Sequence, residues 1–593
     1  MFGLHTDIEL IILDCITTNR DLRALCLTSK ACHERAIPRL FRQITIPLWH
    51  SSALLFYQQF QPGDKDYLKH TRKLTVVHEE ITNPLNGFAP EDKDKPDEDA
   101  VKLAGDLGLV VFMAILQLFP TNVLHEFRFV SSRCLPLMAL RHLSLKQRLI
   151  TNLRSSYVDS PLPMNASWPS DLFHFVRHLD LYIDGPPSQL SNCLYGLAST
   201  HTPIESLSLT LYLHHDDSED VQQYLWAAME ESGVERPRPA MPNLRELALS
   251  GFDLSLPYLP VLQKFVKFER LTKLQVSNCH QASTFFADLG AITSIERFHL
   301  EHIAVDSLNE DPEDGADSEE EDTPIDDCLE QVFQKSGKLQ SLHLGWHEHC
   351  LDARAVNTIQ ITLQTLYRDG ESLRILSLHP HNETDYEESV NSLGTHLERV
   401  CEACPNLEQL GYQLADGTLD SEIGAPNSEL SEFVNRIAKL HNLHTLHLRY
   451  PHEVSAYPWD PYMCDLEERR GYMKKLSRIL QYIASEIFLQ LERLGKDTGL
   501  RHKLDTIVIG HFTTLRQQSS KCSLPQHCFI KALTAGRRVD MPSDWTSPTD
   551  PGIRVFCAEL VSRTVLRQLR FHTEILDLDP GVEPFEQWAA RAL

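Results

Sequence analysis

Residues that could carry chemistry are common in this chain, but their spacing matches no catalytic signature. The sequence contains no phosphate-binding glycine-rich loop, no Gly-x-Ser-x-Gly, no His-Glu-x-x-His and no EF-hand loop. Cys401-Glu-Ala-Cys404 is a single Cys-x-x-Cys pair, and a structural zinc site needs four ligands. We therefore expect structural cysteines here, no catalytic residue, no cofactor and no metal, and we expect the chain not to be an enzyme.

The histidines offer a second set of potential ligands, because the chain contains 29 of them. His347-Glu-His349-Cys350 places three such residues side by side after a predicted strand. Alternate residues of an extended chain point to opposite sides, so this arrangement favours ordinary polarity over a metal site. Other histidines fall on the polar surface predicted below, where they are either ordinary polar residues or part of a pH-sensitive partner surface.

The composition argues against several classes of function. The 593-residue chain has a formal net charge of −26, which disfavours nucleic acid and anionic membranes as partners. Its 14 cysteines are scattered, which is typical of reduced core residues. No secretory signal pattern is visible, and the most apolar stretch, Leu107–Phe119, is too short to span a bilayer and predicts a buried helix. We expect a cytoplasmic or nuclear protein.

One hydrophobic pattern recurs along most of the chain, and the elements that it predicts must position any functional side chain. It reads apolar, two residues, apolar, one residue, apolar, and it is typical of leucine-rich repeats, although the intervals are irregular. Clear copies begin at Val176, Ile204, Leu244, Leu271, Ile295, Leu339, Leu373, Leu407, Leu443 and Leu504. Weaker copies lie at Leu74/Val76, Leu124/Phe127/Phe129 and Leu566/Leu569/Phe571.

Each copy predicts a short strand whose apolar residues face a core and whose intervening residues point the other way. The intervening residues are nearly all polar, and an unsolvated face would not tolerate them. We therefore expect a concave parallel sheet with a solvated polar face that binds a target, and helices on the convex side. A compact α/β domain is the alternative, which the long series of strands disfavours. The candidate target-binding residues are His178, Asp180, Tyr182, Lys273, Gln275, Arg297, His299, Glu301, His343, His379, His447 and Arg449.

The segments between the strands predict helices and two insertions. Residues 305–327 are strongly acidic and predict a disordered loop, in which Ser318 resembles an acidic-directed kinase site. Residues 461–495 have helical spacing and predict one long helix packed on the repeats. Residues Ser519–Asp550 are rich in serine, proline and threonine, so we expect irregular structure there. Further helices are expected at Glu219–Glu231, Pro257–Phe268, Ala353–Tyr367, Tyr386–Ala403 and Ser428–Lys439.

The first 46 residues have the pattern of three short helices followed by a strand at Ile44–Ile46. Thr6 opens a capping box, Asn19 and Asp21 can cap a second helix, and Ser29 can cap a third. Pro38 should interrupt the third helix, because proline cannot continue one. Three such helices form a poor independent core, which favours a docking module.

Residues 4–46 resemble an F-box of the kind common in fungi. The resemblance is carried, in order and spacing, by Leu4-His-Thr-Asp-Ile8, Asp21-Leu-Arg-Ala-Leu-Cys-Leu-Thr-Ser29-Lys30 and Pro38-Arg-Leu-Phe41-Arg42-Gln-Ile44. His5 and Asp7 stand where the family has proline and glutamate. The resemblance implies docking on the Skp-family linker of a cullin–RING ubiquitin ligase. The docking surface that it implies is Leu4, Ile8, Leu22, Leu25, Leu27, Ser29 and Lys30.

The sequence thus predicts an α/β protein in four parts. These are a three-helix F-box (1–46), first irregular repeats (47–175), a leucine-rich-repeat solenoid (176–515), and an irregular segment with a capping repeat (516–593). The expected function is substrate recognition for an SCF-type ligase, with the Skp-family linker, a cullin behind it and an unidentified target protein as partners. The alternative is a non-catalytic repeat scaffold that acts outside ubiquitination, in which the first helices cap the array.

Overall fold

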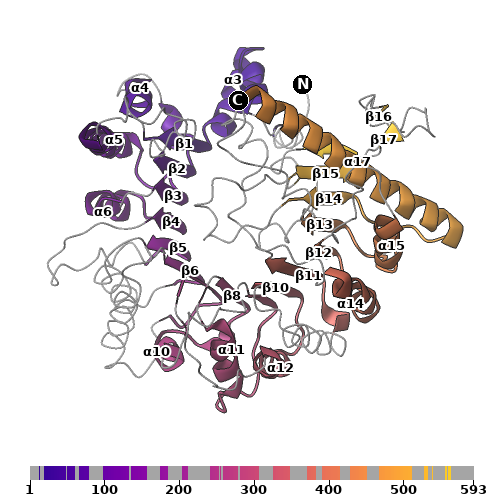
Figure 1. Cartoon of the computed structure of the whole chain (residues 1–593). Helices are drawn as coiled ribbons and strands as arrows, with labels where there is room; N and C mark the ends of the chain where they lie inside the picture. Colours follow the sequence, from indigo (N-terminus) through magenta and orange to yellow (C-terminus); the bar gives the residue numbers. More distant parts are fainter. Residues whose placement is uncertain are drawn as a thin grey trace. The chain divides into compact units, whose positions relative to one another are not determined.

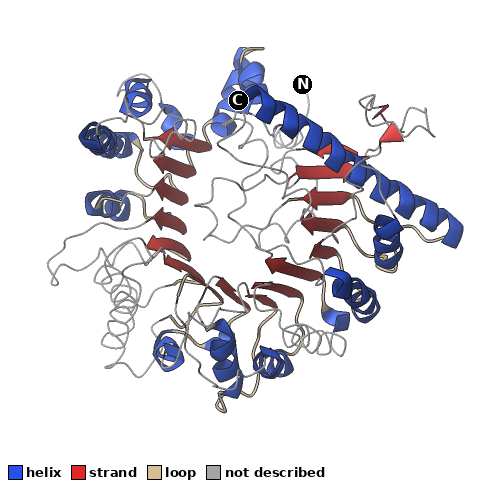
Figure 2. Cartoon of the chain, viewed as in Figure 1, coloured by secondary structure: helices blue, strands red, loops and turns tan. Residues whose placement is uncertain are grey.

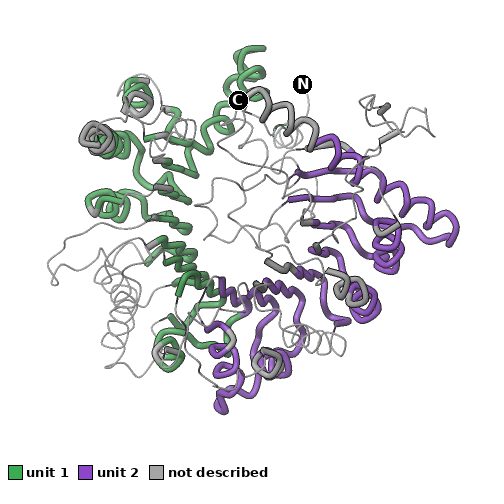
Figure 3. Tube along the Cα trace, viewed as in Figure 1, with its two compact units in different colours: residues 1–252, 257–271 green, residues 253–256, 272–593 purple. Residues whose placement is uncertain are grey.

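The structure is a computed structural model in which two compact units are distinguished (Figure 3). Unit 1 comprises residues 1–252 and 257–271, and unit 2 comprises residues 253–256 and 272–593. The residues that the structure describes are 13, 16, 19–48, 50–59, 66–78, 98–131, 135–156, 174–183, 203–211, 241–252, 254, 258–277, 279, 281–305, 325–347, 370–381, 390–413, 428–449, 466–510, 527–531, 537–538, 555–556, 558–561 and 566. None of the helices in these ranges combines the length and the apolar character needed to cross a membrane.

The first helices that the structure describes in full are α2 (Asn19–Cys26) and α3 (Lys30–Leu40), where the sequence predicts them, whereas the helix predicted from Asp7 lies mostly outside the described residues. Ser29 caps α3, because its hydroxyl oxygen accepts a hydrogen bond from the Cys32 N–H at 3.1 Å. The predicted interruption at Pro38 is wrong, since α3 continues through it. Pro38 lies in the last turn of α3, where its missing N–H removes one hydrogen bond near the end of the helix without ending it.

The rest of unit 1 is a parallel sheet with helices on one of its faces (Figures 1 and 2). The strands pair in chain order, each parallel to the next. They are β1 (Gln43–Pro47), β2 (Lys73–His78), β3 (Glu126–Ser131), β4 (Asn152–Ser156), β5 (His178–Ile183), β6 (Ser206–Leu211) and β7 (Glu246–Ser250). In its described residues the helices are α4 (His50–Gln59), α5 (Glu98–Leu118), α6 (Leu137–Lys146) and α10 (Tyr258–Phe265), with the short 3-10 helices η1 (Asp66–His70) and η3 (Phe268–Arg270).

Alternation along each strand separates the two faces of this sheet. On the helix side, Phe127 and Phe129 of β3 pack on Phe112 of α5, with ring centroids 6.4 and 5.9 Å away. All three rings are fully buried, so the apolar half of the repeat pattern forms the core of the unit. The residues between them point away from α4, α5, α6 and α10, onto what we call the polar face of unit 1.

A repeated backbone contact sets where each strand begins. One carbonyl before a strand accepts two successive N–H groups of the next repeat: Arg72 O accepts from His125 at 2.8 Å and from Glu126 at 3.0 Å. The same paired contact recurs along both units, so the backbone groups at the strand starts are satisfied. The strand register is therefore fixed by the backbone as well as by the apolar side chains.

Unit 2 has the same construction, with parallel strands from β8 to β14 and helices on one face (Figure 2). The strands are β8 (Lys273–Ser277), β9 (His302–Val305), β10 (Ser341–His347), β11 (Ile375–His381), β12 (Gln409–Gln413), β13 (Thr445–Arg449) and β14 (Thr506–Ile509). Between these strands the structure describes the helices α11 (Ala282–Ala291), α12 (Ile325–Ser336), α14 (Val390–Ala403) and α15 (Ser428–Ile437), with the 3-10 helix η5 (Gly370–Ser372). The fold is α/β, and the predicted parallel sheet is confirmed in both units.

The predicted strand at Ile295–Leu300 is wrong, because β9 lies further along the chain. The sequence contains a second, overlapping copy of the pattern, Leu300-x-x-Ile303-x-Val305. Ile303 and Val305 pair in register with Leu274 and Val276 of β8, so the second copy is the one that joins the sheet. Periodicity alone could not choose between two copies that share Leu300.

The end of unit 2 departs from the repeat. The strands β15 (His527–Lys531) and β18 (Ala558–Val561) continue the sheet in antiparallel orientation, while β16 (Arg537–Arg538) and β17 (Val555–Phe556) form a separate pair. The irregular structure predicted for Ser519–Asp550 is therefore wrong over β15. Cys528, Phe529 and Ile530 are buried in succession, and a continuous apolar run of this kind does not follow the repeat pattern.

The long helix predicted for residues 461–495 is confirmed as α17 (Leu466–Thr498). Its buried residues Leu480, Ile483 and Ile487 follow helical spacing. Gln481 Nε2 of this helix donates to the Ala558 carbonyl of β18 at 2.9 Å, which anchors the helix to the end of the sheet. The predicted helices Glu219–Glu231 and Ala353–Tyr367, and Ser318 in the acidic insertion, lie outside the described residues.

Candidate functional site

The residues of the implied docking surface differ in their exposure. Leu22 is buried and Leu25 half-buried, whereas Lys30 is exposed. Leu27, in the turn between α2 and α3, is 88% exposed. The Ser29 side chain is half-buried and caps α3. Leu4 and Ile8 lie outside the described residues.

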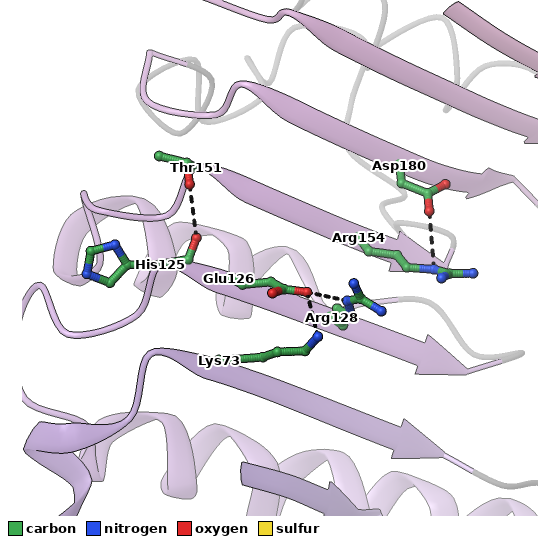
Figure 4. Close-up of polar contacts among 7 residues, drawn as sticks. All are labelled: Lys73, His125, Glu126, Arg128, Thr151, Arg154 and Asp180. Atoms are coloured by element: carbon green, nitrogen blue, oxygen red, sulfur yellow. Dashed lines mark hydrogen bonds and ion pairs between the residues drawn. The ribbon is translucent and has the colours of Figure 1, made fainter. Parts of the chain in front are cut away.

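The polar face of unit 1 carries a row of charged side chains from successive strands (Figure 4). Glu126 on β3 is the centre of the first group. Its Oε1 atom lies 3.0 Å from the Lys73 ammonium of β2 and is also in close contact with the Arg128 guanidinium of its own strand. One carboxylate oxygen thus serves two cations.

The second group joins β4 to β5. Arg154 and Asp180 hold paired positions of the two strands, and Arg154 Nε lies 3.2 Å from Asp180 Oδ2. The Arg154 guanidinium also lies over the Tyr182 ring, with its central carbon 4.8 Å from the ring centroid. Together these contacts hold one guanidinium between a carboxylate and an aromatic face.

Burial changes the proton affinity of this second group. The pKa of Asp180 is raised because burial disfavours the charged carboxylate, and the neighbouring Arg154 and Ser208 offset this only in part. Burial and the Asp180 charge raise the pKa of Tyr182 to about 12, so the phenol stays protonated near neutral pH. The Asp180 side chain keeps 30% of its exposure, but its Oδ1 atom is buried without a hydrogen-bond partner among the described residues.

Sequence reasoning selected only part of this row. It named His178, which is exposed, and Asp180 and Tyr182, but it missed Lys73, Glu126, Arg128 and Arg154. The first three flank the weak pattern copies of β2 and β3. Arg154 lies in Ile150-x-x-Leu153-x-Ser155, where a buried serine replaces the last apolar residue and hides the copy. The signal that would have found them is a charged residue directly before or between the apolar positions of the weak copies.

The candidate residues of β8 and β9 have different outcomes. Lys273 and Gln275 lie on β8 as predicted and are half-buried. Arg297, His299 and Glu301 are exposed, but they precede β9 and do not belong to the face of the sheet, because the strand uses the second copy of the pattern.

The histidines predicted to be solvated on β10 and β13 are buried. His343 is 6% exposed, and its Nδ1 atom lies 2.8 Å from the hydroxyl of Ser377 at the paired position of β11. His447 is fully buried, in register with Gly411 and Val508. Hydrogen bonding inside the protein can replace water at such sites, so polarity did not predict solvation. The side chains of His379 on β11 and Arg449 on β13 lie outside the described residues.

A hydrophobic cluster accompanies the buried histidines of unit 2 and shields part of this face of the sheet from solvent. It lies on the face of the sheet away from α11, α12, α14 and α15, and it consists of Ile375, Val508, Cys528, Ile530 and Leu566. Leu566 is fully buried, and the rest of the weak copy predicted at Leu566/Leu569/Phe571 lies outside the described residues. A solvated polar surface was expected on this face, and the structure has a second core there.

The potential metal ligands do not form a site among the described residues, where no group of three or more suitable side chains comes together. Cys401 and Cys404 are free and buried, and burial raises the pKa of each thiol to about 12.

No protein-family model matches the chain, and no curated protein matches it.

Proposed function

We propose that this chain is a non-catalytic adaptor that joins a target protein to a cullin–RING ubiquitin ligase. The region of α2 and α3 would bind the Skp-family linker, and the polar face of unit 1 would bind the target. Transfer of ubiquitin belongs to the partner enzymes, and the adaptor acts by raising the local concentration of the target.

The observation that carries the docking half is the exposure of Leu27. Leu27 lies between two helices and is 88% exposed to water. A partner that buries this side chain fully would stabilise the complex by about 1.5–3 kcal/mol. It lies beside Ser29 and Lys30, which belong to the same motif. A partner that covers this turn would therefore gain affinity from Leu27.

The target half is supported by the difference between the two units. The charged row of unit 1 keeps substantial exposure, with 41% for Arg128 and 30% for Arg154. In unit 2, His343 and His447 are buried and the cluster around Leu566 occupies part of the corresponding face. We therefore limit the proposed target surface to the charged row of unit 1 and leave out the strands of unit 2.

A second function, a repeat scaffold outside ubiquitination, is favoured by the packing of α3. Phe41, directly after this helix, stacks on Tyr67 of η1 with ring centroids 5.0 Å apart. This contact ties the first helices to the first repeat, as a cap requires. If the chain is such a scaffold, Leu27 does not bind a Skp-family linker.

Binding of the full chain to recombinant Skp-family linker tests the proposal. Wild-type protein should bind, and Leu27→Asp should weaken binding by about tenfold or more, because a charge cannot be buried at the interface without cost. Leu55→Asp is the matched control, since Leu55 on α4 is 58% exposed but lies outside the docking motif. It should bind as the wild type does.

The scaffold reading makes the opposite forecast. Wild-type chain would show no linker binding at micromolar concentration, and deletion of residues 1–46 would destabilise the array. Equal loss of binding in Leu27→Asp and Leu55→Asp would also count against the docking surface proposed for Leu27.

A further inference from the structure

The charged row on the polar face of unit 1 is not neutral. Lys73, Arg128 and Arg154 provide three cationic groups, and Glu126 and Asp180 provide two carboxylates, which leaves one positive charge in excess. The chain as a whole has a net charge of −26, so this local excess runs against its overall composition.

The excess is concentrated at two arginines. Arg128 and Arg154 hold directly paired positions of β3 and β4, where like charges repel each other. Arg128 shares a single oxygen of Glu126 with Lys73, so this carboxylate neutralises it only in part. A group of opposite charge placed between the two arginines would remove the repulsion.

Both arginines also have guanidinium N–H groups that could donate hydrogen bonds to a bound anion. Arg128 approaches Glu126 through its Nε atom, and its terminal nitrogens have no hydrogen-bond partner among the described residues. Arg154 lies over the Tyr182 ring, its Nε atom approaches Asp180 and its Nη2 atom donates to the Tyr182 hydroxyl, which leaves Nη1 without a hydrogen-bond partner among the described residues. Both guanidinium groups are half-buried, so they are reachable by a ligand but lie in a medium where charges interact more strongly than in water.

We propose that Arg128 and Arg154 form a binding site for an oxyanion, a carboxylate or a phosphate, carried by a side chain of the target protein. The planar guanidinium group matches either anion with two parallel hydrogen bonds. Glu126 and Asp180 are positioning residues that fix the arginines. This inference rests on the proposed function only in taking the polar face as the target-binding surface.

Site-resolved chemical modification of the full chain tests the site without a known target. Phenylglyoxal reacts with accessible arginines, and mass spectrometry measures the rate at each one. The probes are sodium phosphate and sodium acetate, compared with sodium chloride at equal ionic strength. At least one of the two should slow the modification of Arg128 about threefold or more, because an anion that is bound to the guanidinium by charge-assisted hydrogen bonds shields it from the reagent. The arm that protects identifies the source of the oxyanion.

Arg177 is the internal control, because it is an exposed arginine of the same unit that is paired with Glu205 at 3.4 Å and lies before β5 rather than on the polar face. Its rate should be the same in all three salts. Arg154→Gln should remove the protection of Arg128, and Arg154→Lys should restore part of it. Thermal denaturation of each variant establishes that it is folded.

Two outcomes would overturn the site: Arg128 is protected no better than Arg177, or its protection persists in the folded Arg154→Gln variant. Linker binding, measured on the same preparations, separates the two proposals. Loss of anion protection with intact linker binding rejects the oxyanion site alone, whereas protection without any linker binding rejects the adaptor function alone.

Discussion

Arg154 and Asp180 form an ion pair across β4 and β5, with 3.2 Å between Nε and Oδ2, yet the second oxygen of Asp180 is buried without a partner among the described residues. The contact is an ion pair without a well-formed hydrogen bond, because Arg154 Nε also has no hydrogen-bond partner among the described residues. Burial of the carboxylate costs more than Arg154 returns, which is why the pKa of Asp180 is raised rather than lowered.

The raised pKa of Asp180 predicts how stability depends on pH. The native state keeps this proton to a higher pH than the unfolded chain, whose aspartate pKa is about 3.9. The contribution of the group is thus full below that value and is lost as pH rises through the raised pKa. Asp180→Asn cannot ionise, so its free energy of unfolding should increase relative to the wild type between about pH 4 and 7.

Urea denaturation at a series of pH values measures this difference. Asp497→Asn, which removes an exposed carboxylate of α17, is the control and should follow the wild type throughout. A wild-type protein that gains stability relative to Asp180→Asn as pH rises would show that the ion pair outweighs the cost of burial.

The cluster on the closed face of unit 2 predicts a large effect of Leu566→Ala. Leu566 is fully buried among Ile375, Val508, Cys528 and Ile530, so truncation should cost about 2–5 kcal/mol of stability. Urea denaturation gives the free energy, and faster amide hydrogen exchange in β14 and β15 locates the loss. Leu500→Ala, at a position that is 46% exposed, should change stability by about 0.5 kcal/mol or less. A similarly small effect of Leu566→Ala would contradict the second core.

The buried thiols of Cys401 and Cys404 should be inert in the native protein. The thiolate is the reactive form, and a pKa of about 12 leaves almost none of it near neutral pH. Native iodoacetamide labelling near neutral pH, followed by mass spectrometry, should leave both unmodified. The same reagent should label both in urea. Rapid native labelling of either cysteine would contradict the burial and reopen a reactive or metal-binding role.

Much of the fold was determined by the sequence alone. The strands from β5 to β8 and from β10 to β14 coincide with clear copies of the apolar pattern, and α17 coincides with its helical spacing. These elements are predictable because one face of each must leave water, and that requirement writes a period into the sequence. The cap at Ser29 was predictable for a similarly local reason.

Only the tertiary structure decided the register of the strands, which residues pair across them, and which polar side chains are buried. Two overlapping copies around Leu300 fit the pattern equally well, and pairing with β8 selected the second. Arg128 and Arg154 are 26 residues apart in sequence, and only the register of β3 and β4 makes them neighbours. His343 and His447 are polar, but their burial depends on what packs around them. Such facts depend on contacts between distant segments, which a local pattern does not contain.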